Sequence, residues 1–522
     1  MKKKTRLSQS STAHMVFTLM SLLAAVIFNS FNIWWVFIDG TVGIDHFCEG
    51  LLIFVALNTV LMGTLAALRV RKKEGLKPQK ILFTISAVLS FLFFAFAFGY
   101  GIGLAVDESS ASFLLSLCDT LAKAIPLSAI IALVIYYPAF GCKTKKFLAV
   151  TALVFASLWI INDFFPLTPY KLVSEPMVID TGKEYSVVFA TNDYGTGYIE
   201  YTYDGNDYKV TDNTAGRLNS DRKIHSIGVP YEHLKNNTYK VGSTRVIDEY
   251  SYGSRLGKTV VSEEYTFTCN DSDDQTYLVI SDWHAMPDTA YSAIGYAGEY
   301  DGVILLGDSA PNVDFESDVI KNTVIFGGKV SSGTKPVIYV RGNHETRGDY
   351  ANDLPTALGL EELYYTTDVG PYSFIVLDSG EDKVDSHREY GGLTDYGSYR
   401  AEMVEWLKTA EAANSKVIAL SHAWQVSTVE EDLCRTAWDE LDRIGTRLII
   451  SGHTHTCRLL SSEADGIEGE IFTAHPDTIG YMDGGKSGKN YIASKLTLSK
   501  DGFAIEAYDN LGQEIFRDSF TW

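Results

Sequence analysis

The feature that most constrains the fold is a series of short apolar segments in the second half of the chain. Each has the length of a β-strand, and helix-like stretches such as Tyr399–Ala413 and Glu430–Ile444 lie between several of them. The segments end at Ile280, Leu306, Val340, Leu377, Leu420 and Ile450. Alternating strands and helices are typical of α/β domains built on a parallel sheet. The sequence therefore predicts an α/β domain over residues 271–522.

Polar side chains able to hold a metal ion follow most of these predicted strands. The candidates are Asp282, His284, Asp308, Asn343, His422, His453 and His455. In open α/β sheets, ligands bind outside the carboxyl ends of the strands. Taken singly, each histidine could be a structural residue at a strand end. Taken together, the placements favour a metal site.

The residue types suit the hydrolysis of a phosphate ester. Two metal ions about 3.5–4 Å apart can share and deprotonate a water and clamp the phosphoryl group. Such a pair needs a bridging carboxylate and donors that suit Mn, Fe or Zn. Asp308 is the natural bridge, and the glycine before it allows a sharp turn beneath the metals. Asp282 and His284 alternate along an extended segment, so both can reach one ion.

The same residues form five sequence blocks in a fixed order. The blocks are Asp282-Trp-His284, Gly307-Asp308, Gly342-Asn-His-Glu345, His422 and Gly452-His-Thr-His455. This set resembles the signature of the calcineurin-like metallophosphoesterase superfamily. The resemblance implies a four-layer α/β sandwich that holds two divalent metal ions and acts on a phosphate ester.

The resemblance also implies a role for each residue. The first ion would be held by Asp282, His284 and His455, the second by Asn343, His422 and His453, with Asp308 bridging. His344 would not bind metal. It would stabilise the transition state and protonate the leaving oxygen, a role that suits an imidazole. Glu345 would be structural, and Arg341 or Arg347 could contact phosphate or form salt bridges.

Two positions depart from related enzymes. In purple acid phosphatases the first block lacks the histidine present here as His284. In those enzymes a tyrosine three residues after the bridging aspartate binds ferric iron, whereas this chain has Pro311 at that position. Many relatives place an aspartate there to orient the catalytic histidine. Pro311 cannot do this, so the sequence leaves open what orients His344.

Residues 166–270 carry short alternating or β-rich runs, separated by turn signals such as Asn192-Asp-Tyr-Gly195. The runs are Tyr185–Ala190, Tyr198–Tyr203, Lys223–Val229, Thr238–Val246 and Glu264–Cys269. Short strands at this spacing favour a small all-β sandwich. The stretch Arg222–Val229 with Leu234–Val241 resembles the fibronectin type III-like domain that precedes the catalytic domain of purple acid phosphatases.

The first third of the chain is unusually apolar. Five stretches, about 15–38, 50–68, 81–106, 113–140 and 147–165, are long enough for helices that span a lipid bilayer. Lys and Arg gather in alternate connecting loops, which sets the orientation of such spans. The sequence therefore predicts an α-helical membrane bundle over residues 1–165. The N-terminus would be cytoplasmic, and everything after Phe165 would lie outside the cytoplasm, at the cell membrane.

Charge is also unevenly spread. Residues 1–170 carry 14 Lys and Arg against 8 Asp and Glu, and the remaining residues carry 30 against 57. So acidic a balance argues against nucleic-acid binding, which relies on basic patches.

These observations predict a multi-domain protein with a helical membrane bundle, an all-β sandwich and an α/β catalytic domain. Its expected function is that of a membrane-anchored, extracytoplasmic metal-dependent phosphoesterase acting on phosphate mono- or diesters. An alternative is a membrane sensor or receptor that uses the phosphoesterase domain as an output or as a binding module. The sequence leaves the oligomeric state open.

Overall fold

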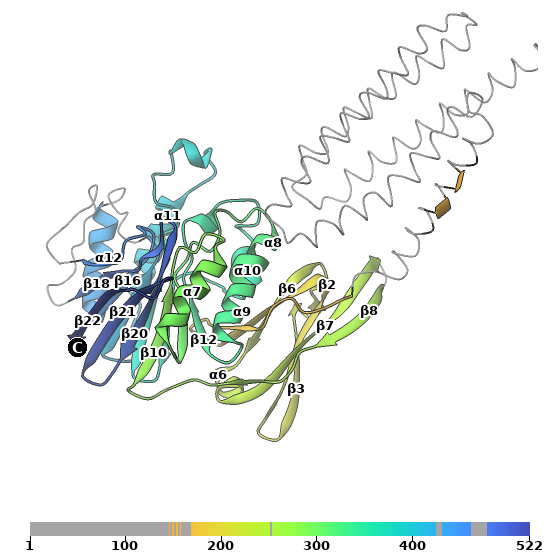
Figure 1. Ribbon diagram of the computed structural model, residues 1–522, viewed down its shortest axis with the longest axis horizontal. Helices are drawn as coiled ribbons and strands as arrows, with labels where there is room; N and C mark the ends of the chain where they lie inside the picture. The colour runs from red at the N-terminus through yellow and green to blue at the C-terminus, as the bar shows by residue number, and fades with distance from the viewer. Residues whose placement is uncertain are drawn as a thin grey trace, which may run out of the picture. The chain divides into compact units, whose positions relative to one another are not determined.

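The structure is a computed structural model that describes residues 169–250, 253–423, 431–460 and 478–522, with the isolated positions 146, 149, 150, 153, 154 and 157. The chain divides into two compact units, Met1–Pro169 and Tyr170–Trp522. Nearly all of the described residues belong to the second unit (Figure 1). Every candidate ligand lies in this unit.

Three parallel strands lie at the centre of the larger sheet. They are β10 (Gln275–Ile280), β11 (Gly302–Leu305) and β12 (Pro336–Tyr339). Nearly all of their residues are buried, as expected for parallel strands covered on both faces. Antiparallel strands extend the sheet beyond β10: β20 (Asn490–Leu498), β21 (Gly502–Asp509) and β22 (Glu514–Thr521), with the short β19 (Gly485–Ser487) on β20.

Helices cover the outer face of this sheet. Helix α7 (Pro287–Ala297) packs on β20 and β21, and α9 (Ile325–Ser331) packs on β11 and β12. The chain enters α9 through α8 (Glu316–Val319) and the π-helical turn η1 (Ile320–Val324). After β12 come the 3₁₀ turn η2 (His344–Thr346) and the short helix α10 (Leu354–Leu358).

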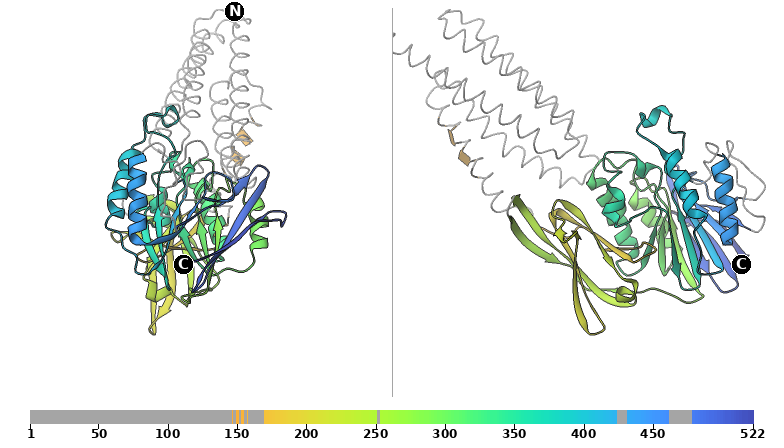
Figure 2. Two further views of the ribbon diagram at one scale, coloured as in Figure 1. Left: turned by 90° about the vertical axis from the view of Figure 1, so that its left-hand side faces the viewer. Right: turned by 180° about the vertical axis from the view of Figure 1, so that it is seen from behind.

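The second sheet lies against the inner face of the first. Its strand order is β13 (Tyr365–Val369), β14 (Tyr372–Leu377), β15 (Lys416–Ser421), β16 (Thr446–Ser451), β18 (Ile479–Met482) and β17 (Arg458–Leu460). Side chains alternate between two cores, since Phe374 and Val376 join the core between the sheets, while Ile375 and Leu377 join the core beneath the helices. Helices α11 (Tyr396–Leu407) and α12 (Glu431–Ile444) form this outer layer, and η3 (Arg388–Tyr390) precedes them (Figure 2).

Strand β1 (Met177–Asp180) extends the larger sheet into the preceding segment. It pairs in parallel with β12 on one side and antiparallel with β2 (Tyr185–Tyr203) on the other. The strands beyond are antiparallel: β3 (Asn206–Thr211), β6 (Arg222–Val229), β7 (Asn237–Tyr250), β8 (Gly253–Val261) and β9 (Tyr265–Phe267). The remaining elements here are the ribbon β4 (Asn213–Thr214) and β5 (Arg217–Leu218) and the helix α6 (Tyr231–Leu234).

The predicted fold class is wrong in two respects, of which the first is the separate all-β sandwich over residues 166–270. The strands of that segment exist, but they belong to one sheet of 14 strands that also contains the catalytic strands. All four residues of β1 are buried, and a strand buried on both faces is stable inside a sheet.

The second correction concerns the α-helical membrane bundle predicted over residues 1–165. Across the part of the chain that the structure describes, no helix has the length and apolar character needed to cross a membrane. The longest there, α12, has 14 residues, against the ~20 that a span needs. The five apolar stretches fall outside the described residues, isolated positions aside. The described chain has instead a mixed β/α fold. The domain boundaries and the extracytoplasmic location stay predictions.

Candidate metal centre

The fold gathers the seven predicted ligands at one edge of the two sheets. Asp282 and His284 follow β10, Asp308 follows β11 and Asn343 follows β12. The second sheet adds His422 after β15, and His453 and His455 after β16. Because these strands are parallel, their carboxyl ends open on the same side. Loops distant in sequence thereby meet in space.

The backbone beneath this centre is strained. Asp282, His284, Asp308, His453 and His455 all have positive φ angles, of 51°, 38°, 57°, 72° and 55°. Non-glycine residues rarely adopt such angles, and they cluster at functional sites. The loops are also tightly packed: a Cβ on Gly342 would lie 2.3 Å from both the backbone nitrogen and Oδ1 of Asp308.

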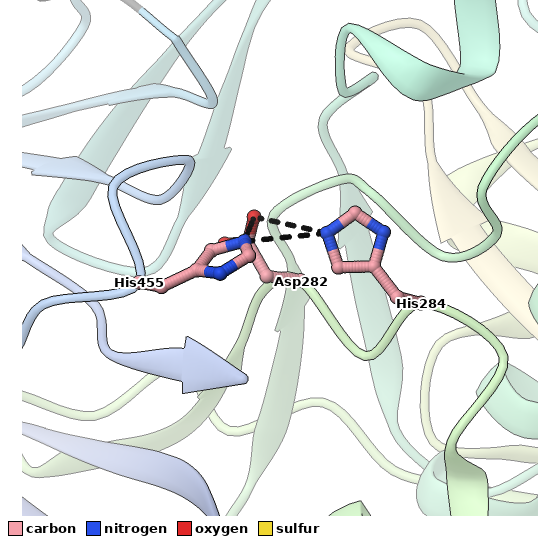
Figure 3. A group of neighbouring side chains, drawn as sticks. All are labelled: Asp282, His284 and His455. Carbon is pink, nitrogen blue, oxygen red and sulfur yellow. Dashed lines mark hydrogen bonds and ion pairs between the residues drawn. The ribbon is translucent and has the colours of Figure 1, made fainter. Parts of the chain in front are cut away.

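The first cluster consists of Asp282, His284 and His455, whose side chains point toward one another (Figure 3). The Nε2 atoms of the two histidines are 3.3 Å apart. Oδ1 of Asp282 lies 3.1 Å from Nε2 of His455 and 3.8 Å from Nε2 of His284. This oxygen is buried and forms no hydrogen bond of good geometry with any described residue. An orphaned carboxylate oxygen facing two imidazole nitrogens fits a bound cation.

The second cluster is built on Asp308, His422 and His453. Oδ2 of Asp308 lies 3.2 Å from Nε2 of His422. The inward oxygen of Asn343 lies 3.1 Å from Nδ1 of His453, and this side chain approaches Asp308 and His422 to 3.3 Å. Without an ion, the opposite amide orientation would satisfy more hydrogen bonds. A cation would hold the amide oxygen inward.

Asp308 lies between the two clusters. Its Oδ2 is 3.2 Å from Nε2 of His422 in the second cluster and 3.7 Å from Nε2 of His284 in the first. Its Oδ1 accepts a hydrogen bond from the backbone nitrogen of His344, at 2.9 Å. Asp308 therefore has the position that a carboxylate shared by two ions would need.

Backbone carbonyls fix the two most important imidazole rings. Nδ1 of His422 donates to the carbonyl oxygen of Leu306 at 2.6 Å, which leaves Nε2 free to face the centre. Nδ1 of His344 donates to the carbonyl oxygen of Pro311, also at 2.6 Å. Nε2 of His344 then lies 3.8 Å from Oδ2 of Asp308. Pro311 has no side-chain acceptor, but its backbone carbonyl orients the ring of His344.

Burial and mutual charge set the protonation of the centre. Burial alone would raise the pKa of the Asp308 carboxyl, but His422 outweighs it and holds that pKa below its usual value. For His422, burial lowers the pKa, but Asp308 and Asp282 outweigh it and raise the pKa to about 10. Burial lowers the pKa of His284 to about 4, which favours the neutral ring that a metal ligand must have.

Glu345 ties two of the ligand loops together. Its buried carboxylate accepts hydrogen bonds from the backbone nitrogens of Asp308 at 2.9 Å, Ser309 at 2.5 Å and Gly342 at 3.1 Å. It therefore holds the end of β11 against the end of β12, as a structural residue would.

Three acidic residues that the sequence did not single out surround the centre. Asp378, which follows β14, pairs with Arg341 at 2.8 Å. Glu381 pairs with Arg347. Asp382 lies 3.7 Å from Nε2 of His453. The position of Asp378 at a strand end was a usable signal. Glu381 and Asp382 lie in a loop and carry no motif.

Trp283 and His387 lie near the ligand blocks in the sequence but belong to neither cluster. Trp283 is fully buried, stacks on Phe326 and donates to the carbonyl oxygen of Asn322 at 2.8 Å, so it packs rather than lining a cleft. His387 begins η3. Trp424 and His475, which also lie near these blocks in the sequence, are outside the described residues.

The donor set as a whole fits divalent metal ions. Carboxylates, an amide oxygen and imidazoles suit Mn, Fe or Zn, and in each cluster the candidate atoms lie within 4.8 Å of one another. In the first cluster the orphaned Asp282 oxygen supports this fit, and in the second the amide orientation of Asn343 does.

Comparison with known proteins agrees with this chemistry. Residues 276–457 match the family described as calcineurin-like phosphoesterase. No curated protein matches the sequence.

Several solved structures are similar to about half of the chain. One is described as GAP50, the anchor in the inner membrane complex of Plasmodium (13% identity, 48% of this chain and 89% of that chain, TM-score 0.34). Another is a predicted phosphoesterase from Streptococcus pneumoniae (14%, 48% and 98%, TM-score 0.24). A third is the phosphoesterase Yfce from E. coli (13%, 47% and 98%, TM-score 0.23).

Likenesses this distant do not bear on function, and the family match and the centre carry the assignment. Residues 276–457 thus form a calcineurin-like phosphoesterase domain, with clusters that could bind the divalent metals this family uses, and the chain is a hydrolase acting on phosphate esters.

Proposed function

We propose that the domain hydrolyses phosphate mono- or diesters at a centre of two divalent ions, with Mn, Fe or Zn as candidates. The first ion is held by Asp282, His284 and His455, the second by Asn343, His422 and His453, and both by Asp308. The position of Asp308 carries the proposal, because one of its oxygens faces His422 and His284 from different clusters.

When bound, two such ions supply an activated water and positive charge for the phosphoryl oxygens. The chain supplies the acid. Nε2 of His344 faces the centre, and the backbone of Pro311 and the backbone nitrogen of His344 fix the ring beside Asp308. His344 thereby donates a proton to the leaving oxygen, and its ring must be replenished from solvent, to which its side chain is 27% exposed.

The test uses the purified full chain with nitrophenyl phosphate and bis-nitrophenyl phosphate, with Mn added or a chelator present. We expect metal-dependent hydrolysis of at least one ester. His344→Ala should lower kcat by roughly 10²–10⁴-fold while the metal content stays at two ions. His233→Ala, a histidine of α6, is the control. A folded, metal-loaded protein inert on both esters contradicts the proposal, and loss of metal from His344→Ala contradicts the division of roles.

A further inference from the structure

Two arginines lie beside the centre, and the structure separates their roles. The guanidinium of Arg341 is 9% exposed and pairs with the buried Asp378 at 2.8 Å. It also lies over the ring of Tyr399, 5.7 Å from its centroid. Arg341 is therefore committed to the protein interior and cannot reach a substrate.

Arg347 is held differently. Its Nε and Nη2 atoms donate to the two carboxylate oxygens of Glu381, at 2.6 and 2.8 Å. This two-pronged pairing fixes the plane of the guanidinium. The remaining nitrogen, Nη1, faces the centre and lies 3.4 Å from Nε2 of His344. The side chain as a whole is 31% exposed.

Glu381 is built to hold that arginine. It is 1% exposed, and it also accepts hydrogen bonds from the hydroxyls of Thr346 at 2.9 Å and Tyr390 at 3.0 Å. The two bonds from Arg347 and the neighbouring hydroxyls thus stabilise this buried carboxylate. Its partners Thr346 and Arg347 directly follow the Asn343–Glu345 block, so Glu381 orients the chain next to the proposed acid.

We propose, resting on the function above, that Arg347 binds the phosphoryl group of the substrate and that Glu381 is its positioning residue. Nη1 donates to a non-bridging phosphoryl oxygen and gives up its contact with His344, whose Nε2 is then free for the leaving oxygen. A guanidinium suits this task because it stays charged and presents directed donors to phosphate oxygens.

The first test measures KM, kcat and the inhibition constant of inorganic phosphate for the metal-loaded full chain and for Arg347→Ala. Loss of one charged hydrogen bond predicts a fall in kcat/KM of about 10–100-fold, and phosphate inhibition weakened by about the same factor. Metal content should be unchanged. The control is Arg517→Ala, since Arg517 on β22 is also paired with a glutamate but on the surface, where its Nε and Nη2 atoms donate to one oxygen of Glu514 at 2.9 and 2.6 Å.

The second test is a double-mutant cycle with Glu381→Gln. If Glu381 acts through Arg347, Glu381→Gln weakens phosphate inhibition less than Arg347→Ala does, and Arg347→Ala/Glu381→Gln is no worse than Arg347→Ala alone. The double variant also removes both charges, so it covers the case in which Arg347→Ala leaves a buried carboxylate unpaired and fails to fold.

The outcomes separate this inference from the function on which it rests. A wild-type chain that hydrolyses no ester contradicts the proposed function. The role of Arg347 is overturned if the wild-type chain is active and Arg347→Ala keeps KM, kcat and phosphate inhibition within about twofold of the wild-type values. Additive losses in the cycle overturn the positioning role of Glu381.

Discussion

His344 takes its orientation from a peptide carbonyl rather than from a side chain. Relatives with an aspartate at the position of Pro311 use a carboxylate for this purpose. Here the main chain bends so that the Pro311 oxygen accepts from Nδ1 of His344 at 2.6 Å. Sequence could not reveal this acceptor, because every residue type carries the same carbonyl.

Replacement of Pro311 by alanine tests this reading. Pro311→Ala keeps the carbonyl, so we expect kcat and its pH profile to stay within about threefold of wild type, the change costing under 1 kcal/mol through chain entropy. Steady-state kinetics across pH 5–9 measure this. A loss as large as that of His344→Ala would show that the proline ring, and not the carbonyl, sets the histidine.

Asp483 lies behind the first cluster, and its titration makes the stability of the fold depend on pH. Ser281 and Ser494 donate to its two oxygens at 2.6 and 2.5 Å, yet complete burial raises its pKa to about 7. An unfolded aspartate titrates near 3.9. Between roughly pH 4 and 7, the folded protein therefore holds a proton that the unfolded chain has released, and the stability falls as the pH rises.

Asp483→Asn removes that titration. In metal-free protein, the free energy of unfolding of the variant relative to wild type should rise from pH 4 to pH 7 and level off above it. The full change is on the order of 4 kcal/mol. Denaturant titrations with a chelator present measure the difference. A difference that does not change with pH contradicts the raised pKa.

At the scale of elements, the strand ends were the dependable signal. The helices predicted over Tyr399–Ala413 and Glu430–Ile444 are present as α11 and α12, although α11 begins at Tyr396 and ends at Leu407. The polar residues after the strands meet at one edge. The sequence wrongly predicted a turn between two short strands where the structure has the single long strand β2. Asn192-Asp-Tyr-Gly195 looked like a turn, but the strand runs through it with a register shift between Ala190 and Gly195. Pairing with β6 and β7 outweighs the local preference of these residues.

The side chain of Glu345 holds together the loops that follow β11 and β12. Glu345→Gln keeps the shape but sets an amide NH₂ group against backbone N–H donors, so at least one of the three bonds is lost. We expect a loss of stability of about 1–3 kcal/mol and weaker metal binding, because the loops of Asp308 and Asn343 separate. Thermal unfolding and metal titration measure these effects. Glu389→Gln, at an exposed position of η3, is the control.

The whole described unit is organised by the single 14-stranded sheet. The sequence indicated the two groups of strands but not their union, since β1 is only four residues long and its partner lies far along the chain. A chain that begins at residue 271 lacks β1, which leaves the edge of β12 unpaired.

We therefore expect residues 271–522 to aggregate or to unfold at a temperature many degrees below that of Tyr170–Trp522, because an exposed apolar edge strand is a template for aggregation. Size-exclusion chromatography and thermal unfolding of the two purified chains measure this. Equal stability of both would show that β1 is dispensable to the catalytic half.

The pairing of β1 with β12 also bears on the order in which the protein is made. Val178 pairs with Pro336 and Ile179 with Val337, a separation of 158 positions. The ribosome releases β1 long before β12 is synthesised. The edge of β1 that pairs with β12 therefore has no strand partner while β10 and β11 are synthesised. Closure over so long a loop is slow. The β11 and β12 loops that carry Asp308 and His344 thus acquire their support late in folding, after the greater part of the chain has emerged.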